Sequence, residues 1–513
     1  MRFHPWRRRL PAALISALLA IAVIVPPVAA EDITVSKGFR KAVTLAGIRE
    51  HQAALQAIAD ANGGTRLSGT AGYDQSVDYV QAKLEAAGYA VTIQPFTFQL
   101  VSDRTPPEFQ QVSPTAATYV NGVDYNTATY SGSGDTTAPL ASPIGDIRGC
   151  YAADYAGFPA GSIALVQRGT PAGFPGGACT FRIKAINAVQ AGASAILIFN
   201  NAPGAPNFTL AEPRFTHSVL GVTQALGESL RIQMSGGPVV VHVKTDTIAE
   251  ERTTYNVIAE TATGDPNNVV VVGAHLDSVS RGPGINDNGS GSAAILEIAE
   301  QYAAQGRVAR NKIRFMWFGA EEHGLIGSTR YVASLPQSDL DKIMAMLNFD
   351  MIGSPNFVRF VYDGDGSDST PAGPPGSAFI EDLFVDYFNS QGLANEPTQF
   401  SGRSDYGPFI TRGIPAGGLF TGAEGIKTVA QAATYGGTAG AQYDPCYHLA
   451  CDTYENNSNT ALDQMSDAAA HVTLFLSRTK VDISMTDASA ALRSSGTPAQ
   501  EDFEDHDHEG ATE

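Results

Sequence analysis

The sequence predicts an α/β protein in which helices cover both faces of a mixed, mainly parallel central sheet, with a β-rich domain inserted into it. After Tyr255, short and almost continuously apolar strands alternate with helical segments, which is typical of a parallel sheet that is buried on both faces. Between Pro106 and Val243 the composition changes to loops rich in Gly, Pro, Ala and Ser with short apolar strands. The 513 residues provide enough length for about two to three domains.

The composition excludes several classes of protein. Hydrophobic residues make up 43% of the chain and charged residues 17%, so most of the chain is expected to be globular. Lys and Arg total 33 against 52 Asp and Glu, which gives a net charge of −19, and no basic stripe interleaved with aromatic residues is present. Nucleic acid is therefore not an expected partner.

Residues 1–30 have the pattern of a secretory signal peptide. Four arginines precede the apolar run Leu14–Val25, and the small residues Val28-Ala29-Ala30 follow two prolines. The alternative, a membrane anchor, is disfavoured because the run is short and the prolines interrupt it. We therefore expect an exported chain, extracellular or periplasmic, with no membrane segment after the signal is removed.

The first α/β segment, residues 31–112, opens with two predicted helices and a strand. Apolar residues at helical spacing predict a helix over Leu45–Ala61, which the glycines after Asn62 end. A second helix is expected to be capped by Asp74 and ended by Gly88, and Val91–Phe98 then alternates like a strand.

The inserted domain is expected over residues 113–247. It contains the short apolar strands Ile163–Val166, Ala195–Phe199 and Val239–Val243. A helix after Cys179 is expected to bury three apolar residues at helical spacing, which are Ile183, Ile186 and Val189. No convincing catalytic cluster is visible in this domain.

The α/β pattern resumes over residues 248–485. Strands are expected at Val269–Val272, Ile313–Phe318 and Ile343–Phe349, with helices at Ala293–Tyr302 and Leu325–Ala333. Residues 486–513 end in a strongly acidic stretch with no Lys or Arg from Ser494 onward, which predicts a disordered tail.

Four cysteines in an exported chain suit two disulfides, and three pairings are possible in principle. We favour Cys150–Cys179 and Cys446–Cys451, because each of these pairs falls within one predicted unit.

Acidic and histidine side chains follow one predicted strand after another. Ligands of open α/β sheets gather beyond the carboxyl ends of the strands, so these side chains are expected to converge. Each short motif also has an ordinary structural explanation, since His-x-Asp can be a structural pair and Asn-Asp-Asn-Gly a simple turn. The side chains are His275, Asp277, Asp287, Glu321, Glu322, Asp350 and, in the loop between the last two cysteines, His448.

This set of side chains predicts a metallohydrolase. Two histidines and three carboxylates, one of them shared, can hold two metal ions about 3.5–4 Å apart, and zinc suits mixed N and O ligands without thiolate. One acid of the Glu321-Glu322 pair is then available to accept a proton from water and to pass one to a leaving amine. Metal-independent serine hydrolysis is disfavoured because no Gly-x-Ser-x-Gly turn is present.

At these residues the sequence resembles the exported co-catalytic dizinc aminopeptidases of bacteria, of the leucyl aminopeptidase type. The motifs that carry the resemblance occur in order, and they are Gly273–Ser278, Gly284–Gly291, Phe318–Glu322, Asn348–Met351 and Tyr447-His448. The resemblance covers about residues 44–477 and implies the zinc exopeptidase fold, with residues 31–112 and 248–485 as one discontinuous catalytic domain. The insert resembles the protease-associated (PA) domain through Gly177–Phe181 and Ala191–Ala193.

The resemblance also implies roles for single residues. One zinc is expected on His275, Asp287 and Asp350, and the other on Asp287, Glu322 and His448. Glu321 is implied as the general base and acid. Asp277 is implied to orient His275, and Tyr447 to donate to the tetrahedral oxyanion.

Two further residues are candidates for the substrate pocket. Similar enzymes carry segments like those around Arg403 and Phe420 next to the substrate. The alternatives are that Arg403 simply pairs with Asp405 and that Phe420 belongs to the core.

The sequence thus predicts a secreted, monomeric zinc aminopeptidase that removes large apolar, leucine-like residues from the N-termini of peptides and proteins. The alternatives are a carboxypeptidase of the same fold, a non-catalytic receptor or binding protein, and a glutaminyl cyclase. Calcium is a further expectation because acids are plentiful, although no defined calcium-binding loop is visible.

Overall fold

The computed structural model describes Met1, residues 29–481 except 173, 176–178, 203 and 207, and Ile483. The predicted signal peptide, apart from Met1, Ala29 and Ala30, and the whole predicted acidic tail lie outside the described residues. Gly177 of the PA-like motif also lies outside them. Among the described residues, no helix is both long and apolar enough to cross a bilayer.

The predicted fold class is confirmed. The central sheet of the larger body runs β13-β12-β14-β11-β9-β10-β8, and the pairs β10/β9, β9/β11, β11/β14 and β12/β13 are parallel. Its strands are β8 (Val240–Glu260), β9 (Asp265–His275), β10 (Asn311–Phe318), β11 (Ile343–Phe349), β12 (Phe360–Tyr362), β13 (Glu396–Thr398) and β14 (Ala416–Phe420).

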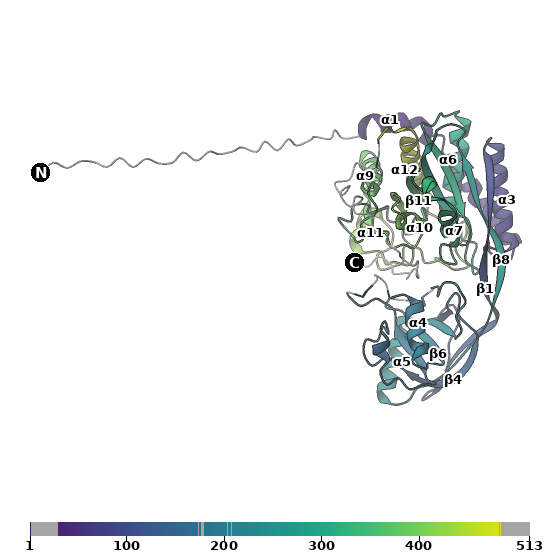
Figure 1. The fold of residues 1–513 in the computed structure, drawn as a ribbon, viewed down its shortest axis with the longest axis vertical. Helices are drawn as coiled ribbons and strands as arrows, with labels where there is room; N and C mark the ends of the chain where they lie inside the picture. The colour runs from purple at the N-terminus through teal and green to yellow at the C-terminus, as the bar shows by residue number, and fades with distance from the viewer. Residues whose placement is uncertain are drawn as a thin grey trace.

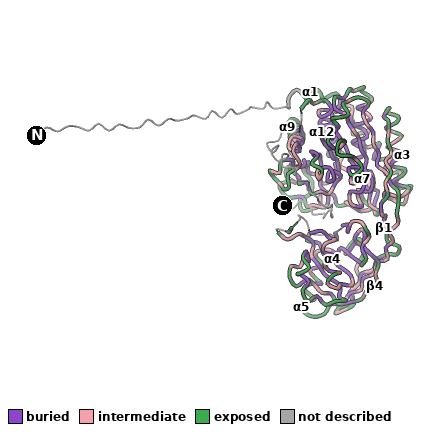
Figure 2. Tube along the Cα trace, viewed as in Figure 1, coloured by how far each residue is buried: buried purple, intermediate pink, exposed green. Residues whose placement is uncertain are grey.

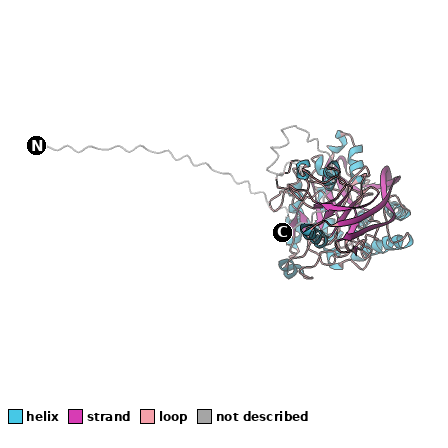
Figure 3. Ribbon diagram, turned by 90° about the horizontal axis from the view of Figure 1, so that it is seen from below, coloured by secondary structure: helices cyan, strands magenta, loops and turns pink. Residues whose placement is uncertain are grey.

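Helices pack on both faces of this sheet (Figures 1 and 3). One face buries apolar side chains of α1 (Ala29–Arg40), α2 (Leu45–Ala61), α3 (Ala71–Ala86), α6 (Gly289–Ala304), α9 (Ser377–Ser390) and α12 (Asn459–Arg478). The other face buries side chains of α7 (Ile326–Ser334), α8 (Gln337–Leu340) and α10 (Gly407–Thr411). A further short helix, α11 (Val429–Tyr435), contributes no buried residue.

The inserted body contains more helix than the sequence suggests. Its strands are β2 (Ala117–Thr118), β3 (Tyr125–Thr127), β4 (Gly134–Ala141), β5 (Ile163–Gln167), β6 (Ala195–Phe199) and β7 (Val219–Val222), with η1 (Ala152–Tyr155), α4 (Phe181–Gln190) and α5 (Gln224–Gly236). The order β4-β5-β6-β7 is parallel throughout, and buried residues fill its centre (Figure 2).

Two strands are far longer than predicted. β1 (Ala90–Ser113) pairs antiparallel with β8 from Ala90↔Glu260 to Ser113↔Val240, with register shifts near Thr105. Figure 1 shows this ribbon running along both bodies, so the predicted strands at Val91–Phe98 and Val239–Val243 are only parts of it. Pro106 and Pro107 suggested a loop from sequence, but they lie at the irregular part of the ribbon, where pairing is relaxed.

Two local predictions are wrong. Asp74 lies in the first turn of α3, and the helix begins after Thr70 instead. In α4 the buried residues are Phe181, Lys184, Ala185 and Ala188, whereas Ile183, Ile186 and Val189 are half-buried. The buried face combines Phe181 and Lys184 with two alanines, and Ile186 and Val189 pack against the edge of the same core.

Both expected disulfides are present. Cys150 is bonded to Cys179 in the inserted body, and Cys446 to Cys451 in the loop before α12.

Candidate metal centre and substrate pocket

The candidate site lies at the carboxyl ends of the parallel strands. His275 is the last residue of β9, Glu321 follows shortly after β10, and Asp350 follows β11 directly. Asp287 stands just before α6, and His448 lies in the disulfide-closed loop before α12. Since β9, β10 and β11 run parallel, their ends meet at one edge of the sheet, as the sequence analysis expects.

The five predicted metal ligands come together there. His275 Nε2 lies 3.2 Å from Asp287 Oδ1 and 3.4 Å from Asp350 Oδ1. His448 Nε2 lies 3.0 Å from Asp287 Oδ2 and 3.0 Å from Glu322 Oε2. The side chains are almost fully buried. The two oxygens of Asp287 therefore face different histidines, which is the arrangement that a shared carboxylate requires.

Two carboxylate oxygens of the predicted metal ligands have no hydrogen-bond donor among the described residues. Glu322 Oε1 and Asp350 Oδ1 are buried and accept no hydrogen bond within the described part of the chain. Buried carboxylate oxygens without a donor are costly unless a cation compensates them. Imidazole and carboxylate donors without thiolate suit zinc at a catalytic site, so the residues present fit a two-zinc centre.

The charges of these side chains depend on one another. Burial raises the pKa of Asp287, but His275 and His448 lower it more, so the net pKa lies well below the usual range. Burial lowers the pKa of His448, but Glu322 and Asp287 raise it to about 10. Burial raises the pKa of Glu322 to about 7, although His448 lowers it.

Glu321 lies at the same site without joining the predicted ligand set. One of its oxygens lies within 4.8 Å of a ring nitrogen of His275 and an oxygen of Asp350. Burial raises its pKa well above the ordinary value; His275 lowers it, while Glu322 and Asp405 raise it. A carboxyl group with a raised pKa is suited to giving and taking protons near neutral pH.

Asp277 lies behind His275. Its Oδ1 is 3.6 Å from His275 Nδ1, and the same nitrogen is 3.3 Å from the backbone oxygen of Asp277. The Glu321 backbone N–H donates to Asp277 Oδ1 at 3.2 Å. Asp277 thus contacts both the imidazole and the backbone of the loop that carries Glu321.

Other residues that hold the ligands were missed by the sequence analysis. Ser404 Oγ donates to Asp350 Oδ2 at 2.6 Å, and Asn348 donates to Ser404 at 2.7 Å. Asp452 accepts the backbone N–H groups of Asn286 at 2.8 Å and Asp287 at 3.0 Å. Asp452 stands next to Cys451 in the sequence, which is the only local signal that could have drawn attention to it.

Arg66 was also missed. It is fully buried and donates to the backbone oxygens of Pro283 at 2.9 Å and Gly284 at 2.7 Å, and also to that of Leu276. It therefore ties the loop after β9 to the loop before Asp287. Nothing near Arg66 in the sequence indicates this partner, which is more than 200 residues away.

Three turns at the site have left-handed backbone at residues other than glycine. They are Ala320 at φ 54°, Met351 at φ 48° and His448 at φ 58°. Such conformations cost about 1–3 kcal/mol each and persist only where the surroundings impose them. Each lies at or next to a predicted functional residue, so the backbone is bent where those side chains must be aimed.

A pocket lined by aromatic side chains opens beside the metal ligands. Phe360, Tyr362, Phe420 and Tyr443 line it together with His275, Glu321 and His448. Phe420 is half-buried and forms part of the wall, and its ring stacks on Phe360 at 6.1 Å between centroids. The candidate Phe420 therefore contacts both the pocket and the core.

Arg403 also lines this pocket, and its partner is not Asp405. Its guanidinium lies 3.2 Å from Glu424 Oε1 and donates to Tyr447 Oη at 3.2 Å. The alternative pairing with Asp405 is therefore wrong. The Tyr447 ring stacks on His448 at 3.8 Å, which places the phenol beside the ligand set.

A wider cavity connects the site to the inserted body. It measures about 410 Å³ and is lined by Glu321, Glu322 and His448 on one side and by residues 127–129, Phe208 and Thr209 on the other. The inserted body thus forms a wall of the approach to the metal ligands.

A second group of carboxylates, which are those of Asp363, Asp365 and Glu381, lies in the loop after β12 and on α9. Backbone N–H groups of the same loop donate to all three residues, for example Gly364 to Glu381 at 2.8 Å. These hydrogen bonds account for the group, and calcium stays a prediction.

Comparison with known proteins agrees with this geometry. The sequence models of peptidase family M28 and of the PA domain match residues 256–473 and 136–230. An aminopeptidase of Pseudomonas aeruginosa is 48% identical over 435 residues, which is 82% of this chain and 79% of that protein. A leucine aminopeptidase 2 of Arthroderma otae is 42% identical over 434 residues, or 84% and 82% of the two chains.

Solved structures show the same architecture. The aminopeptidase from Aneurinibacillus sp. strain AM-1 superposes with a TM-score of 0.68 at 27% identity, covering 86% of this chain and 96% of that one. A zinc aminopeptidase from Bacillus subtilis shares the fold, with a TM-score of 0.62 at 24% identity over 86% of this chain and 97% of that one. With this fold, this convergence of side chains and these relatives, the chain belongs to peptidase family M28, among its aminopeptidases with a PA domain.

Proposed function

We propose that the chain is an exported two-zinc aminopeptidase that releases large apolar residues from the N-termini of peptides. The observation that carries the proposal is Asp287, whose two carboxylate oxygens face His275 at 3.2 Å and His448 at 3.0 Å. The disulfides and the signal-like N-terminal sequence support export.

The ligands would be divided between two zinc ions, each bound by one histidine. His275, Asp287 and Asp350 would hold one ion, and Asp287, Glu322 and His448 the other. When bound, the zinc ions supply Lewis acidity that makes water nucleophilic near neutral pH and polarises the scissile carbonyl.

The remaining side chains would handle protons and charge. The Glu321 carboxylate would accept the proton of the attacking water and pass it to the leaving amine, for which its raised pKa is suited. The Tyr447 hydroxyl, which accepts a hydrogen bond from Arg403, would donate to the developing oxyanion. Asp277 would hold the His275 ring in position.

The pocket supports a preference for large apolar first residues. Its lining combines the aromatic rings of Phe360, Phe420 and Tyr443 with the ligand carboxylates. An apolar side chain would pack on the rings, and the carboxylates would attract the free α-amine.

The pairing of Arg403 disfavours the carboxypeptidase alternative. A carboxypeptidase needs a cation that can receive the C-terminal carboxylate of its substrate. Among the described residues that line the pocket, Arg403 is the candidate for binding this carboxylate. Glu424 lies 3.2 Å from its guanidinium and offsets its charge. A non-catalytic receptor is disfavoured because the ligand set and Glu321 are all present.

Hydrolysis of a matched peptide pair tests the proposal. The purified full chain is expected to release leucine from a free-amine Leu peptide, to leave the N-acetylated peptide intact, and to lose activity with 1,10-phenanthroline until zinc is returned. Cleavage of the acetylated peptide at its C-terminus would support the carboxypeptidase instead. Chelator-resistant activity would contradict the zinc assignment.

A further inference from the structure

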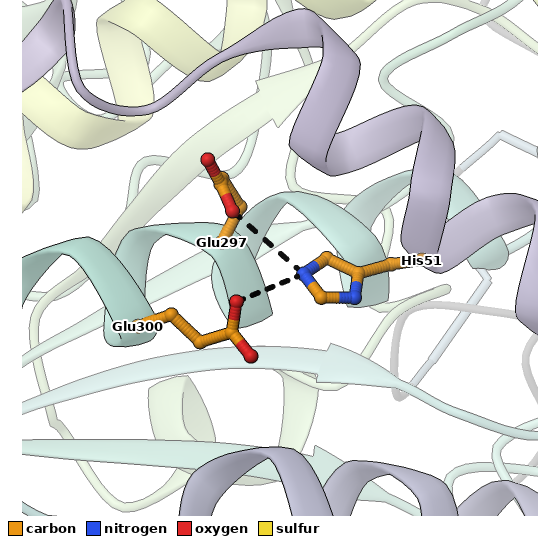
Figure 4. A group of neighbouring side chains, drawn as sticks. All are labelled: His51, Glu297 and Glu300. Atoms are coloured by element: carbon orange, nitrogen blue, oxygen red, sulfur yellow. Dashed lines mark ion pairs between the residues drawn. The ribbon is translucent and has the colours of Figure 1, made fainter. Parts of the chain in front are cut away.

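A second histidine–carboxylate cluster lies away from the peptidase site. His51 of α2 faces Glu297 and Glu300 of α6, with one donor atom from each residue within 4.8 Å of the others. Figure 4 shows the imidazole pointing between the two carboxylates, which project from one face of α6. The His51 side chain is 2% exposed, Glu297 5% and Glu300 23%, so the donor atoms lie mostly out of solvent.

The spacing of the donor atoms fits a bound ion better than direct hydrogen bonds. His51 Nε2 lies 3.4 Å from Glu300 Oε2 and 3.8 Å from Glu297 Oε2, and it makes no hydrogen bond within the described part of the chain. Zinc–ligand bonds of about 2.0–2.1 Å place neighbouring ligand atoms of a tetrahedral ion roughly 3.3 Å apart. His275 Nε2 stands 3.2 and 3.4 Å from its two carboxylates at the candidate zinc centre; the Glu300 distance at His51 falls in this range and the Glu297 distance is longer.

The surroundings of the cluster hold two of its three side chains in position. His51 Nδ1 lies 2.8 Å from the hydroxyl of Tyr79, which matches the pattern of metal-bound imidazoles, whose second N–H donates to an oxygen. Glu297 Oε1 accepts from the backbone N–H of Thr44 at 3.1 Å, which leaves Oε2 for the cluster. A Cβ atom at Gly47 would lie 2.5 Å from the Glu297 carboxyl, so a larger residue there would push this carboxyl aside.

The charge of the cluster also favours a bound cation. Within the described part of the chain, His51 is the sole ion-pair partner of Glu297 and Glu300, and the nearby Lys83 is paired with Glu50 at 3.2 Å. Two carboxylates beside a neutral imidazole carry a charge of −2, which a divalent ion balances. An imidazolium would offset one of the two charges.

We propose that His51, Glu297 and Glu300 form a separate metal site that binds one divalent transition-metal ion, such as zinc. The ion would join α2 to α6, which starts two residues after Asp287. Its role would be to stabilise the catalytic body, since no substrate pocket described above includes these residues. The proposal is independent of the peptidase mechanism.

Metal content of matched variants tests the proposal. Wild type, Glu300→Gln and Glu85→Gln, each as the full chain, are dialysed against buffered zinc and their zinc per chain is measured by atomic emission. Glu300→Gln is expected to hold one zinc less than wild type while its kcat on leucine p-nitroanilide is unchanged. Glu85→Gln makes the same chemical change at an exposed position of α3 outside the cluster, and should keep the wild-type content.

A second variant and a second measurement complete the test. His51→Gln is expected to lose the same equivalent, and zinc should raise the melting temperature of wild type more than that of Glu300→Gln. Equal zinc content in wild type and Glu300→Gln would overturn the proposal and leave an ion pair. Because Glu300 is partly exposed and glutamine has the same size, this variant is expected to fold even if His51→Gln does not.

Discussion

At the scale of single residues, Glu321 and Glu322 show how neighbours in sequence take different positions in the site. The Glu322 carboxylate lies 3.0 Å from His448, within the proposed ligand set. Glu321 lies near His275 and Asp350, where a water proton could be accepted. The two glutamates therefore differ in what their replacement should remove.

Replacing Glu321 by Gln is expected to lower kcat for leucine p-nitroanilide by about 10²–10⁴-fold, the usual contribution of a general base. Zinc content should stay at the wild-type value, because the side chain at this position lies outside the proposed ligand set. Steady-state kinetics and atomic emission measure the two quantities. Glu322→Gln is the matched comparison and should lose zinc as well as activity; unimpaired turnover by Glu321→Gln would exclude its role.

Replacing Ser404 by Ala is expected to weaken zinc binding by about 10–100-fold, since the 2.6 Å hydrogen bond to Asp350 orients that carboxylate. Competition with a chromophoric chelator measures the affinity. Ser401→Ala is a suitable control because the Ser401 hydroxyl lies 3.4 Å from Tyr406 and is not bonded to Asp350. Equal affinities in the two variants would mean that Ser404 does not act through the metal.

At the scale of elements, loops and helix contacts decide whether the ligands stay in place. His448 has φ 58° in a loop that the Cys446–Cys451 disulfide closes. The helix that follows, α12, packs on α1 and α9 through His471, whose Nδ1 lies 2.8 Å from Ser36 Oγ and whose ring stacks on Tyr387.

Removing the Cys446–Cys451 bridge by a double substitution to Ala is expected to weaken zinc binding, because His448 would have to be ordered when the ion binds. Zinc affinity and kcat/KM are the measurements. The matched control removes Cys150–Cys179 in the inserted body and should leave zinc affinity unchanged. If both double variants bound zinc as wild type does, the loop would be held by its other contacts alone.

His471 is expected to make stability depend on pH. Burial, with a smaller contribution from the nearby Arg40, lowers its pKa to about 4. Between the unfolded pKa of about 6.5 and the folded pKa, the unfolded chain binds more protons than the folded chain. The contribution of His471 to stability is therefore complete above about pH 6.5 and decreases as the pH is lowered towards the folded pKa. At about pH 5 the loss should be roughly 2 kcal/mol.

Denaturant unfolding of wild type and His471→Gln at neutral and at mildly acidic pH measures this loss. The variant should lose less stability than wild type on acidification, since glutamine does not titrate. An identical pH dependence in the two proteins would show that His471 does not titrate on unfolding.

At the scale of the whole molecule, the β1–β8 ribbon joins the two bodies, and the proposed zinc ligands join distant parts of one body. β1 and β8 pair over most of their length, from the catalytic sheet to the inserted sheet, where β8 also pairs with β4. The ligands come from segments between residues 275 and 448, so they are assembled only in the folded chain.

Chelation is therefore expected to lower the melting temperature of the full chain. Ions that bind the folded state alone stabilise it by RT ln(1 + [L]/Kd), which is about 4 kcal/mol at a thousandfold excess over Kd. Calorimetry with and without chelator measures the shift, and added zinc should reverse it. A melting temperature that is indifferent to chelator would argue against tightly held metal.

Much of the architecture could be predicted from local patterns. The helix Leu45–Ala61 and the strands Ala195–Phe199 and Ile343–Phe349 have the predicted bounds, because periodicity and end signals lie within each segment. The ribbon was missed because its middle carries Pro106 and Pro107, and its pairing joins residues more than a hundred positions apart.

The sequence by itself determined the fold class, the order of the elements and the functional side chains that follow the strands. The reason is that the carboxyl ends of parallel strands lie at one edge of the sheet, so residues that follow different strands come together there. Only the tertiary structure decided that Arg66 links two loops of the site, that Ser404 orients Asp350, that Arg403 pairs with Glu424, and that His51 meets Glu297 and Glu300. These contacts join residues on separate elements, and no local periodicity encodes which surfaces pack together when the chain folds.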